Sequence, residues 1–423
     1  MAAATRPASL GFDAAVVPRA PPVTHDAIIV GAGVIGVASA EALSRQGLRV
    51  LVIDQRSAAG QGASFANGGQ LSYSYTDALA SPGLLKRLPA ILLGRDPAFR
   101  LRLRADPDYL RWCLAFLRNG SAGAFARNSL AGLELALRSR ELMAELLGQH
   151  PIEFANQVPG KLLLHEDPAG FRAAAANAER KAGAGIDVRA LTPAEAVAIE
   201  PALDGRSARL AGAIFSPGDA VGDAHLFCSR LLERLAGRGV EARFGTEVTR
   251  IEAGDLPALL LASGERLQAR QMLICAGPQA AGLLRTIGWR VPIQPVRGHS
   301  LTLPLGMAAP RVSITDVARK LVFCRLSDRL RIAGLADVGF DTDKVDPARL
   351  ALLHREARKS LPQAADYGSP VGGWAGLRPV TPDSLPIVER RGAITINVGH
   401  GGLGWTYALA TAERAAGLAL QAT

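Results

Sequence analysis

Three glycines near the start of the chain have the spacing of a dinucleotide-binding turn. Gly31, Gly33 and Gly36 form a G-x-G-x-x-G segment, and the acidic residue Asp54 follows 18 positions after Gly36. The first glycine permits a tight turn, the second lets the backbone approach a pyrophosphate, and the third brings a helix close to a strand. The N-terminus of that helix would face the phosphates, and Asp54 would accept hydrogen bonds from ribose hydroxyls. The pattern predicts a dinucleotide site.

Two later glycine-rich segments indicate which dinucleotide is bound. Residues 60–69 and 399–404 combine glycine with Ser, Asn or His. NAD enzymes do not usually need such segments, whereas the long ribityl and isoalloxazine groups of a flavin run across the sheet and need contacts there. A helix beginning near residues 401–404 would place N–H dipoles close to flavin N1 and O2, where they stabilise the negative charge of reduced flavin. The sequence therefore favours FAD.

These segments require a βαβ unit to position them. Residues 27–30 and 49–53 are β-branched runs on either side of a helical stretch at 34–46. Further strands of the same sheet are expected at 241–244, 247–251, 271–277 and 393–398. Residues 290–340 alternate in polarity, which suits a mainly antiparallel sheet. The predicted fold is α/β: a Rossmann-like FAD-binding domain with a second α+β substrate domain built on a mainly antiparallel sheet.

The length of 423 residues also favours two domains. We expect a disordered N-terminal tail at residues 1–25. The FAD-binding domain is expected to be discontinuous, with segments 26–80, 200–285 and 372–423. Residues 81–199 and 286–371 are assigned to the substrate domain.

The composition argues against several other functions. The net charge is +10, but only six of the 48 basic residues are lysine and no run of five like charges occurs, so we expect no nucleic-acid binding. The four cysteines are far apart without metal-like spacing, which suits reduced thiols in the cytoplasm and predicts no metal site. The sequence contains no stretch of 18 consecutive apolar residues, so we expect no membrane-spanning helix.

One region has a local excess of positive charge. Between Lys86 and Arg118 the chain has eight basic and three acidic residues, with Leu, Ile, Phe and Trp between them. This composition suits either a peripheral membrane contact or a solvated helical face of the second domain.

Five segments together resemble the bacterial D-amino acid dehydrogenases, which belong to the D-amino acid oxidase-like flavoprotein superfamily. The resemblance extends from about residue 26 to the C-terminus and is carried by residues 64–70 (SFANGGQ), 217–223 (PGDAVGD), 295–299 (PVRGH), 376–383 (GLRPVTPD) and 399–406 (GHGGLGWT). It implies oxidative deamination of a D-amino acid to a 2-oxo acid and ammonia, with electrons passed to a quinone or another acceptor than O2. It also implies an enzyme associated with the cytoplasmic face of the membrane.

The resemblance also extends the set of candidate cofactor contacts, with Ser64, Asn67 and Gln70 expected to hydrogen-bond the flavin. The full set comprises Gly31, Gly33, Val34, Ile35, Gly36, Asp54, Gln55, Ser64, Asn67, Gly69, Gln70, Val248, Ala276, Gly277, Gly401, Gly402, Leu403, Gly404 and Thr406. A cysteine that binds flavin covalently in sarcosine oxidase relatives has no counterpart near Thr381. We therefore expect non-covalent FAD.

Hydride transfer from Cα to flavin N5 requires positioning groups rather than a nucleophile or a metal. Arg378 is the candidate for the substrate carboxylate, because its fork binds carboxylates bidentately and related glycine oxidases have a substrate-binding arginine in a similar segment. Tyr73 and Tyr75 are candidates for the pocket wall, although each also suits a hydrophobic core. His299 and His400 are candidates for proton transfer or for holding the anionic ring, although structural roles suit them as well.

Other functions stay open from the sequence. A D-hydroxyproline or D-proline dehydrogenase and a glycine or sarcosine oxidase are close variants. Some oxidases of the superfamily use a lysine over the flavin to activate O2, and only Lys320 is placed plausibly here, which favours a dehydrogenase. A flavin-binding electron-transfer subunit without its own turnover is the alternative from another class.

Overall fold

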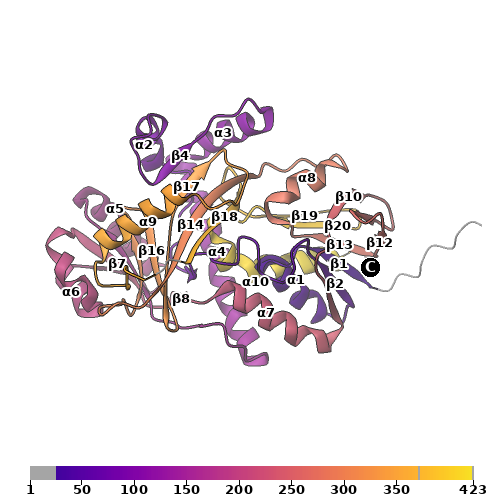
Figure 1. Ribbon diagram of the computed structural model, residues 1–423, viewed down its shortest axis with the longest axis horizontal. Coiled ribbons are helices and arrows are strands. Elements are labelled where there is room, and N and C mark those ends of the chain that lie inside the picture. The colour runs from indigo at the N-terminus through magenta and orange to yellow at the C-terminus, as the bar shows by residue number, and fades with distance from the viewer. Residues whose placement is uncertain (1–24, 370–371, 422–423) are drawn as a thin grey trace, which may run out of the picture.

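The structure is a computed structural model that describes residues 25–369 and 372–421. Two β-sheets form the two halves of the elongated molecule (Figure 1). The first sheet has six strands in the order β19 (Ile387–Arg391), β20 (Ile394–Val398), β13 (Gln271–Ile274), β1 (Ala27–Val30), β2 (Val50–Ile53) and β9 (Val240–Arg243). All neighbours pair in parallel except β19 with β20. This half is the predicted Rossmann-like domain.

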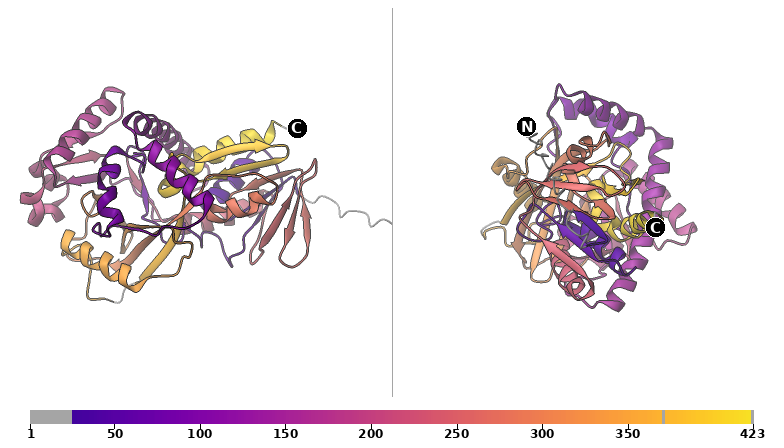
Figure 2. Two further views of the ribbon diagram at one scale, coloured as in Figure 1. Left: turned by 90° about the horizontal axis from the view of Figure 1, so that it is seen from above. Right: turned by 90° about the vertical axis from the view of Figure 1, so that its right-hand side faces the viewer.

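The central strands of this sheet are apolar on both faces because both faces are covered. On one face, Ile29 and Val52 contact the helical layer of α1 (Val34–Ser44), α7 (Ala224–Leu235) and α10 (Gly404–Leu420). On the other face, Ile28 and Ile53 contact a layer formed by β10 (Val248–Glu252), β11 (Ala258–Leu261), β12 (Arg266–Gln268) and α8 (Ala280–Arg285). Figure 2 shows α10 ending beside this half of the molecule.

One strand that we expected in the nucleotide sheet lies in a different sheet, so that prediction is wrong. The run at 247–251 forms β10, which pairs with β11 in a separate three-stranded antiparallel sheet. The neighbouring run at 240–243 forms β9 and does pair with β2, as predicted. A short β-branched run has the same periodicity in either sheet, so only long-range packing separates the two cases.

The second sheet is mixed but mainly antiparallel, as predicted. Its strands follow the order β18 (Gly372–Val380), β14 (Gln294–Pro304), β17 (Arg329–Val338), β16 (Leu321–Leu326), β15 (Ser313–Asp316), β5 (Lys161–His165), β7 (Gly212–Ser216) and β6 (Arg189–Leu191), and β4 (Phe99–Leu101) pairs with β17. One face is covered by α9 (Pro347–Ser360), α6 (Pro193–Ile199) and η1 (Pro201–Arg209). Helix α5 (Pro168–Gly183) packs beside β5 and β7.

The remaining elements connect the halves. Helices α2 (Pro82–Leu92) and α3 (Pro107–Asn119) lie on the outside of the molecule (Figure 1), and α4 (Ala122–Gln149) packs on α10. The pair β3 (Gln70–Leu71) and β8 (Ala220–Val221) and the short turns η2 (Ala236–Arg238), η3 (Gly277–Gln279) and η4 (Gly401–Leu403) complete the described chain. Within it, all four cysteines are free and no helix is long and apolar enough to cross a membrane.

Two of the expected domain boundaries differ from the sheet pairings. Strand β7 lies within the segment 200–285 and β18 lies within 372–423, yet both belong to the second sheet. The second half of α4, expected in the substrate domain, contributes Leu142 and Met143 to the core beneath α1 and α10. The predicted tail lies outside the described residues except for His25.

Candidate active site

A large cavity lies between the two halves. It has a volume of about 1590 Å³ and is lined by residues of both sheets. Pockets for drug-sized ligands are roughly 300–1,000 Å³, so this cavity has room for a dinucleotide and a small substrate together. Most of the predicted cofactor residues line it: Gly31, Gly33, Val34, Ile35, Asp54, Gln55, Ser64, Asn67, Gly69, Gln70, Val248, Ala276, Gly277, Gly401, Gly402, Leu403 and Gly404.

The turn between β1 and α1 leaves no room for side chains at two of its glycines. Gly31 has a φ of +107°, and a Cβ there would lie 2.5 Å from the carbonyl oxygen of Cys275. Gly36 does not line the cavity, because a Cβ on it would collide with the backbone of Gly31. By contrast, the nearest atom to a Cβ on Gly33 would be the Ser64 hydroxyl at 3.5 Å, so the cavity side of the turn is open. The tight turn at Gly31 and the close packing at Gly36 agree with the prediction, and the open side at Gly33 leaves room for the pyrophosphate proposed there.

Hydrogen bonds hold this turn in place. The carboxylate of Asp54 accepts from the N–H of Ala32 at 2.7 Å and from the N–H of Arg56 at 2.8 Å. The hydroxyl of Ser64 accepts from the N–H of Val34 at 3.1 Å. Helix α1 has no side-chain cap at Gly33 and no acidic residue in its first turn. The N–H groups that follow that of Val34 in its first turn can therefore bind an anionic phosphate.

A second helix N-terminus reaches the cavity from the other end of the chain. The turn η4 and the start of α10 have no side-chain cap, and Gly401 has a φ of +56°. His400 precedes this turn, and its Nε2 lies 3.0 Å from the hydroxyl of Thr411. Burial lowers the pKa of His400 to about 3, so its ring is neutral at pH 7. The two uncapped helix starts and the open Gly33 face fit the phosphates and flavin ring of FAD.

The loop at residues 60–70 crosses the second sheet beside the cavity. The Ser300 hydroxyl donates to the carbonyl of Ala66 at 2.6 Å, and Arg331 donates to the carbonyl of Asn67 at 2.9 Å. The side-chain amide of Gln70 donates to the Ser313 hydroxyl at 2.7 Å. Gln70 thus lines the cavity while its amide nitrogen holds the loop on the sheet, a bond that the sequence did not indicate.

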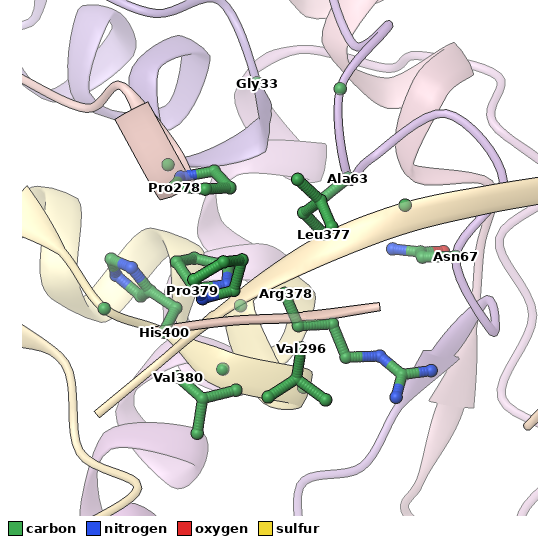
Figure 3. A pocket seen from close by; sticks show the side chains of 18 of the residues that line it. Gly33, Ala63, Asn67, Pro278, Val296, Leu377, Arg378, Pro379, Val380 and His400 are labelled. Atoms are coloured by element: carbon green, nitrogen blue, oxygen red, sulfur yellow. The ribbon is translucent and has the colours of Figure 1, made fainter. Parts of the chain in front are cut away.

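Arg378 lies on β18, directly across from Val296 of β14. Its side chain extends along the cavity wall past Val296 and away from His400 (Figure 3). It passes over Gly298, where any Cβ would collide with the guanidinium. Its Nη1 donates to the carbonyl of Leu335 at 3.2 Å. Leu335 has a φ of +60° at an irregularity of β17, and this conformation directs its carbonyl to the arginine.

The guanidinium of Arg378 has donors to spare. Among the described residues it forms no ion pair and no hydrogen bond other than that to Leu335. Burial lowers its pKa, and the nearby Asp337 opposes that shift without forming an ion pair. A half-buried cation with free donors beside a cavity is suited to binding a carboxylate.

His299 does not share the orientation of Arg378. Side chains alternate along a strand, so His299 points to the opposite face of β14 from Val296 and Gly298. Its Nε2 lies 4.0 Å from Asp337, which also binds Arg297 and Arg100. Burial lowers the pKa of His299 to about 4, and neither ring nitrogen has a hydrogen-bond partner among the described residues. The residue belongs to the cavity wall, but its ring lies in a buried ionic cluster.

Two further predicted residues lie away from the cavity. Tyr73 is buried in the hydrophobic core of the first half, so its assignment to the pocket wall is wrong. Tyr75 does line the cavity. The hydroxyl of Thr406 accepts from the N–H of Ser72 at 3.1 Å inside the protein, so Thr406 fastens α10 to that segment instead of lining the cofactor site. The first error arises because alternate residues of an extended segment face opposite sides, and the second because helix α10 turns Thr406 toward the segment at Ser72.

The sequence missed several cavity residues. Lys161 and Trp374 line the cavity from β5 and β18, and Ser72 lines it beside Tyr75. The only signal for Lys161 was a lysine at the start of an otherwise apolar strand. Lys320, which the sequence did single out, also lines the cavity. The described residues contain no group of three or more side chains that could hold a metal ion.

The fold and this cavity define an FAD-dependent oxidoreductase. A family model described as FAD dependent oxidoreductase matches residues 26–418, and the chain belongs to that family. It is 38% identical to D-amino acid dehydrogenase 2 of Ralstonia nicotianae, over 91% of this chain and 94% of that protein. It is 40% identical to the D-amino acid dehydrogenase of Paramagnetospirillum magneticum, over 90% of this chain and 91% of that protein.

Solved structures share the fold at lower identity. Glycine oxidase from Geobacillus kaustophilus superposes with a TM-score of 0.74 at 24% identity, over 94% of this chain and 95% of that one. L-proline dehydrogenase from P. horikoshii superposes with a TM-score of 0.73 at 19% identity, over 94% of both chains. These similarities show that the fold is shared.

Proposed function

We propose that this chain oxidises D-amino acids to 2-oxo acids and ammonia. The observation that carries the proposal is Arg378, a cation with free hydrogen-bond donors on the cavity wall beside the turn at 401–404. The two D-amino acid dehydrogenases named above, similar over about nine tenths of the chain, support the substrate class.

The chain's own residues bind and orient the substrate. When bound, FAD would supply the acceptor for the hydride that leaves the substrate Cα, and water would hydrolyse the resulting imino acid to the 2-oxo acid and ammonia. Arg378 binds the carboxylate through two parallel hydrogen bonds and thereby fixes the position of Cα. The uncapped start of α10 offers N–H dipoles that stabilise negative charge near it. His299 and His400 are neutral at pH 7 and buried, so they hold structure instead of taking the substrate proton.

The experiment for this proposal is anaerobic reduction of the bound flavin. D-alanine, D-valine, D-norvaline, D-proline, glycine and sarcosine are each mixed with the holoenzyme without O2. The flavin absorbance near 450 nm, roughly the usual flavin maximum, is followed. Bleaching by D-amino acids and not by their L-enantiomers supports the proposal. Selective bleaching by D-proline or by glycine and sarcosine would favour those variants. No bleaching across the panel would favour a flavin-binding electron-transfer subunit.

We propose further that the electrons pass to a quinone or another acceptor than O2. The similar proteins named as dehydrogenases support this acceptor class. Rates of dye reduction and of hydrogen peroxide formation are compared in air with the same substrate. Peroxide formation at the rate of dye reduction would overturn the proposal.

The FAD is proposed to be dissociable. The one cysteine lining the cavity in the described part of the chain is Cys275, whose Cβ lies behind Gly36 at the phosphate end. Burial raises the pKa of its thiol to about 12, so it is not a nucleophilic thiolate. Trichloroacetic acid should leave the yellow colour in the supernatant. Colour retained in the pellet would indicate a covalent bond.

The outer surface of α2 and α3 is proposed to contact an anionic bilayer. Leu110, Leu114 and Leu117 form an exposed stripe along α3, flanked by the exposed Arg111 and Arg118. Leu92, Leu93 and Leu103 are also exposed, at 55%, 66% and 69%. Apolar side chains bordered by arginine suit the interface of an anionic membrane.

Vesicle binding tests this surface. The wild-type chain should sediment with vesicles that contain phosphatidylglycerol and remain in solution with pure phosphatidylcholine. Changing Leu110 and Leu114 to serine should reduce the bound fraction without changing dye-linked activity in solution. Equal sedimentation of wild type and variant would contradict the assignment of this surface.

A further inference from the structure

Trp374 lines the cavity close to Arg378, and the reaction described above does not use it. Both residues lie on β18 at an even spacing, so their side chains point to the same face of the strand. Strand β18 lies at the edge of the second sheet in the described structure, and Gly372 and Gly373, which precede Trp374, are exposed. Trp374 therefore lies between Arg378 and the exposed end of the strand.

The indole of Trp374 lies along the strand, above Gly376. A Cβ at Gly376 would collide with Cη2 and Cζ2 of the indole, so the far edge of the ring occupies the space of a missing side chain. This position directs the ring toward Arg378 and away from the exposed glycines. The absence of a side chain at Gly376 thus makes room for the indole, as its absence at Gly298 makes room for the guanidinium.

The indole and the guanidinium are neighbours on the sheet. Gly376 pairs directly with Gly298 across β18 and β14. The Cβ positions of two directly paired residues are about 4.5–5.5 Å apart on one face of an antiparallel sheet. The ring edge of Trp374 occupies the first of these two positions, and Nη2 of Arg378 occupies the second. The two groups therefore lie side by side, one above each glycine.

The free edge of the guanidinium faces the indole. Nη1 of Arg378 donates to the carbonyl of Leu335 on β17, which lies on the opposite side of β14 from β18. Because the guanidinium is a planar fork, the edge between Nε and Nη2 faces away from Nη1 and toward β18. This edge can bind a carboxylate through two parallel hydrogen bonds. A carboxylate bound there has the indole as its neighbour on β18.

The surroundings of the indole on the sheet contain no competing charge. The positions next to Trp374 on β18 and β14 are uncharged: Gly372, Gly376, Gly298, Ser300 and Thr302. The hydroxyl of Ser300 already donates to the carbonyl of Ala66. An apolar ring at this place keeps water away from the edge of the sheet beside the guanidinium. Opposite charges attract more strongly where water is excluded.

We propose that Trp374 is a positioning residue that shields the ion pair between Arg378 and the substrate carboxylate from water. The indole acts through Arg378 and takes no part in hydride transfer. Every D-amino acid has the same carboxylate, so the contribution of Trp374 is the same for all substrate side chains. This inference rests on the proposed function and adds a residue to its binding site.

Replacement of Trp374 by leucine tests the shielding. In Trp374→Leu, KM should rise by about 10-fold for D-alanine and for D-norvaline alike, because water weakens the hydrogen bonds to the charged carboxylate. Both kcat and FAD content should stay close to those of the wild type. Trp374→Phe, which keeps an aromatic ring, should have a KM within about twofold of the wild type. An unchanged KM in Trp374→Leu, or a rise confined to D-norvaline, would overturn the inference.

Salt dependence separates shielding from a purely structural role. Dissolved ions screen charges that water reaches, so KM for D-alanine should rise more steeply with NaCl in Trp374→Leu than in the wild type. The wild-type KM should change by less than about twofold between roughly 0.05 and 0.5 M NaCl. A wild-type KM that rises as steeply as that of the variant would overturn the inference.

Gly376→Ala tests the position of the ring if Trp374→Leu fails to fold. The new Cβ displaces the indole without removing it, so KM should rise for both substrates. Gly372→Ala is the matched control on the same face of β18, since the nearest atom to its new Cβ is 3.5 Å away. Equal KM values in the two glycine variants would contradict the inference. Absence of wild-type turnover with every D-amino acid would instead contradict the proposed function.

Discussion

At the cofactor end of the cavity, the turn from Gly31 to Gly36 obtains its shape within one βαβ unit and from the neighbouring strand β13. At the substrate end, the position of the Arg378 side chain depends on the absence of a side chain at Gly298 of β14 and on the carbonyl of Leu335 of β17. The first arrangement is built mainly of backbone and is local in sequence, whereas the second is a side chain held by strands far apart in the chain. Mutations should therefore act differently at the two ends.

The largest effect is expected at Gly36. In Gly36→Ala the new Cβ collides with the backbone of Gly31, so α1 must move away from the turn that faces the phosphates. We expect loss of most bound FAD, measured as the ratio of flavin to protein after purification. Gly417→Ala, on α10 with no atom within 4 Å of the new Cβ, is the control and should retain FAD. Full FAD content in Gly36→Ala would contradict the close packing.

The next effect is expected at Arg378. Arg378→Leu removes two charge-assisted hydrogen bonds to the substrate carboxylate and should lower kcat/KM for D-amino acids by about 10²- to 10³-fold, mainly through KM. FAD content should stay unchanged, in contrast to the loss of FAD expected for Gly36→Ala at the cofactor end. Arg290→Leu changes an exposed arginine outside the cavity and should have wild-type kinetics. An unchanged KM in Arg378→Leu would exclude that residue from the site.

A smaller effect is expected at Gly298, because any side chain there would occupy the space of the Arg378 guanidinium. Gly298→Ala should push the guanidinium away from Leu335 and raise KM by about 10-fold, since roughly 1.4 kcal/mol of binding corresponds to that factor. The control is Gly372→Ala on β18, where the nearest atom to the new Cβ is 3.5 Å away. Equal KM values in the two variants would show that Arg378 does not need its present position.

The smallest effect on turnover is expected at His400. His400→Gln should change kcat/KM at pH 7.5 by less than about threefold, because the ring contacts Thr411 and is not assigned to proton transfer. A loss of 100-fold or more would restore His400 as a catalytic residue.

The same variant should change the pH dependence of stability. Burial lowers the pKa of His400 from 6.5 to about 3, so the unfolded chain binds more protons between these values. The free energy of unfolding therefore falls as the pH drops below 6.5, by about 2 kcal/mol at pH 5 from this group. Denaturant unfolding at pH 8, 7 and 5 should show that the free energy of unfolding falls less at pH 5 in His400→Gln than in the wild type. Between pH 7 and 8 the difference in this free energy between the two proteins should stay constant.

The sequence by itself determined the shape of the glycine turn at the cofactor end. Its glycines and Asp54 are adjacent in one βαβ unit, so their spacing carries the geometry of the turn. The run at 399–404 was identified for a similar reason, since a strand, a glycine turn and a helix start follow one another there. The parallel sheet and the mainly antiparallel sheet were predictable because their periodicities differ.

Only the tertiary structure decided the substrate end. It showed that Tyr75 lines the cavity whereas Tyr73 lies in the core, and that His299 points to the opposite face of the sheet from Arg378. A shift of one residue reverses the side of a strand on which a side chain lies. It placed β7 and β18 in the second sheet against the expected boundaries. It also brought Lys161 into the cavity, since β5 joins the second sheet through β15, and the paired residues Lys161 and Ser313 are 152 positions apart in the chain.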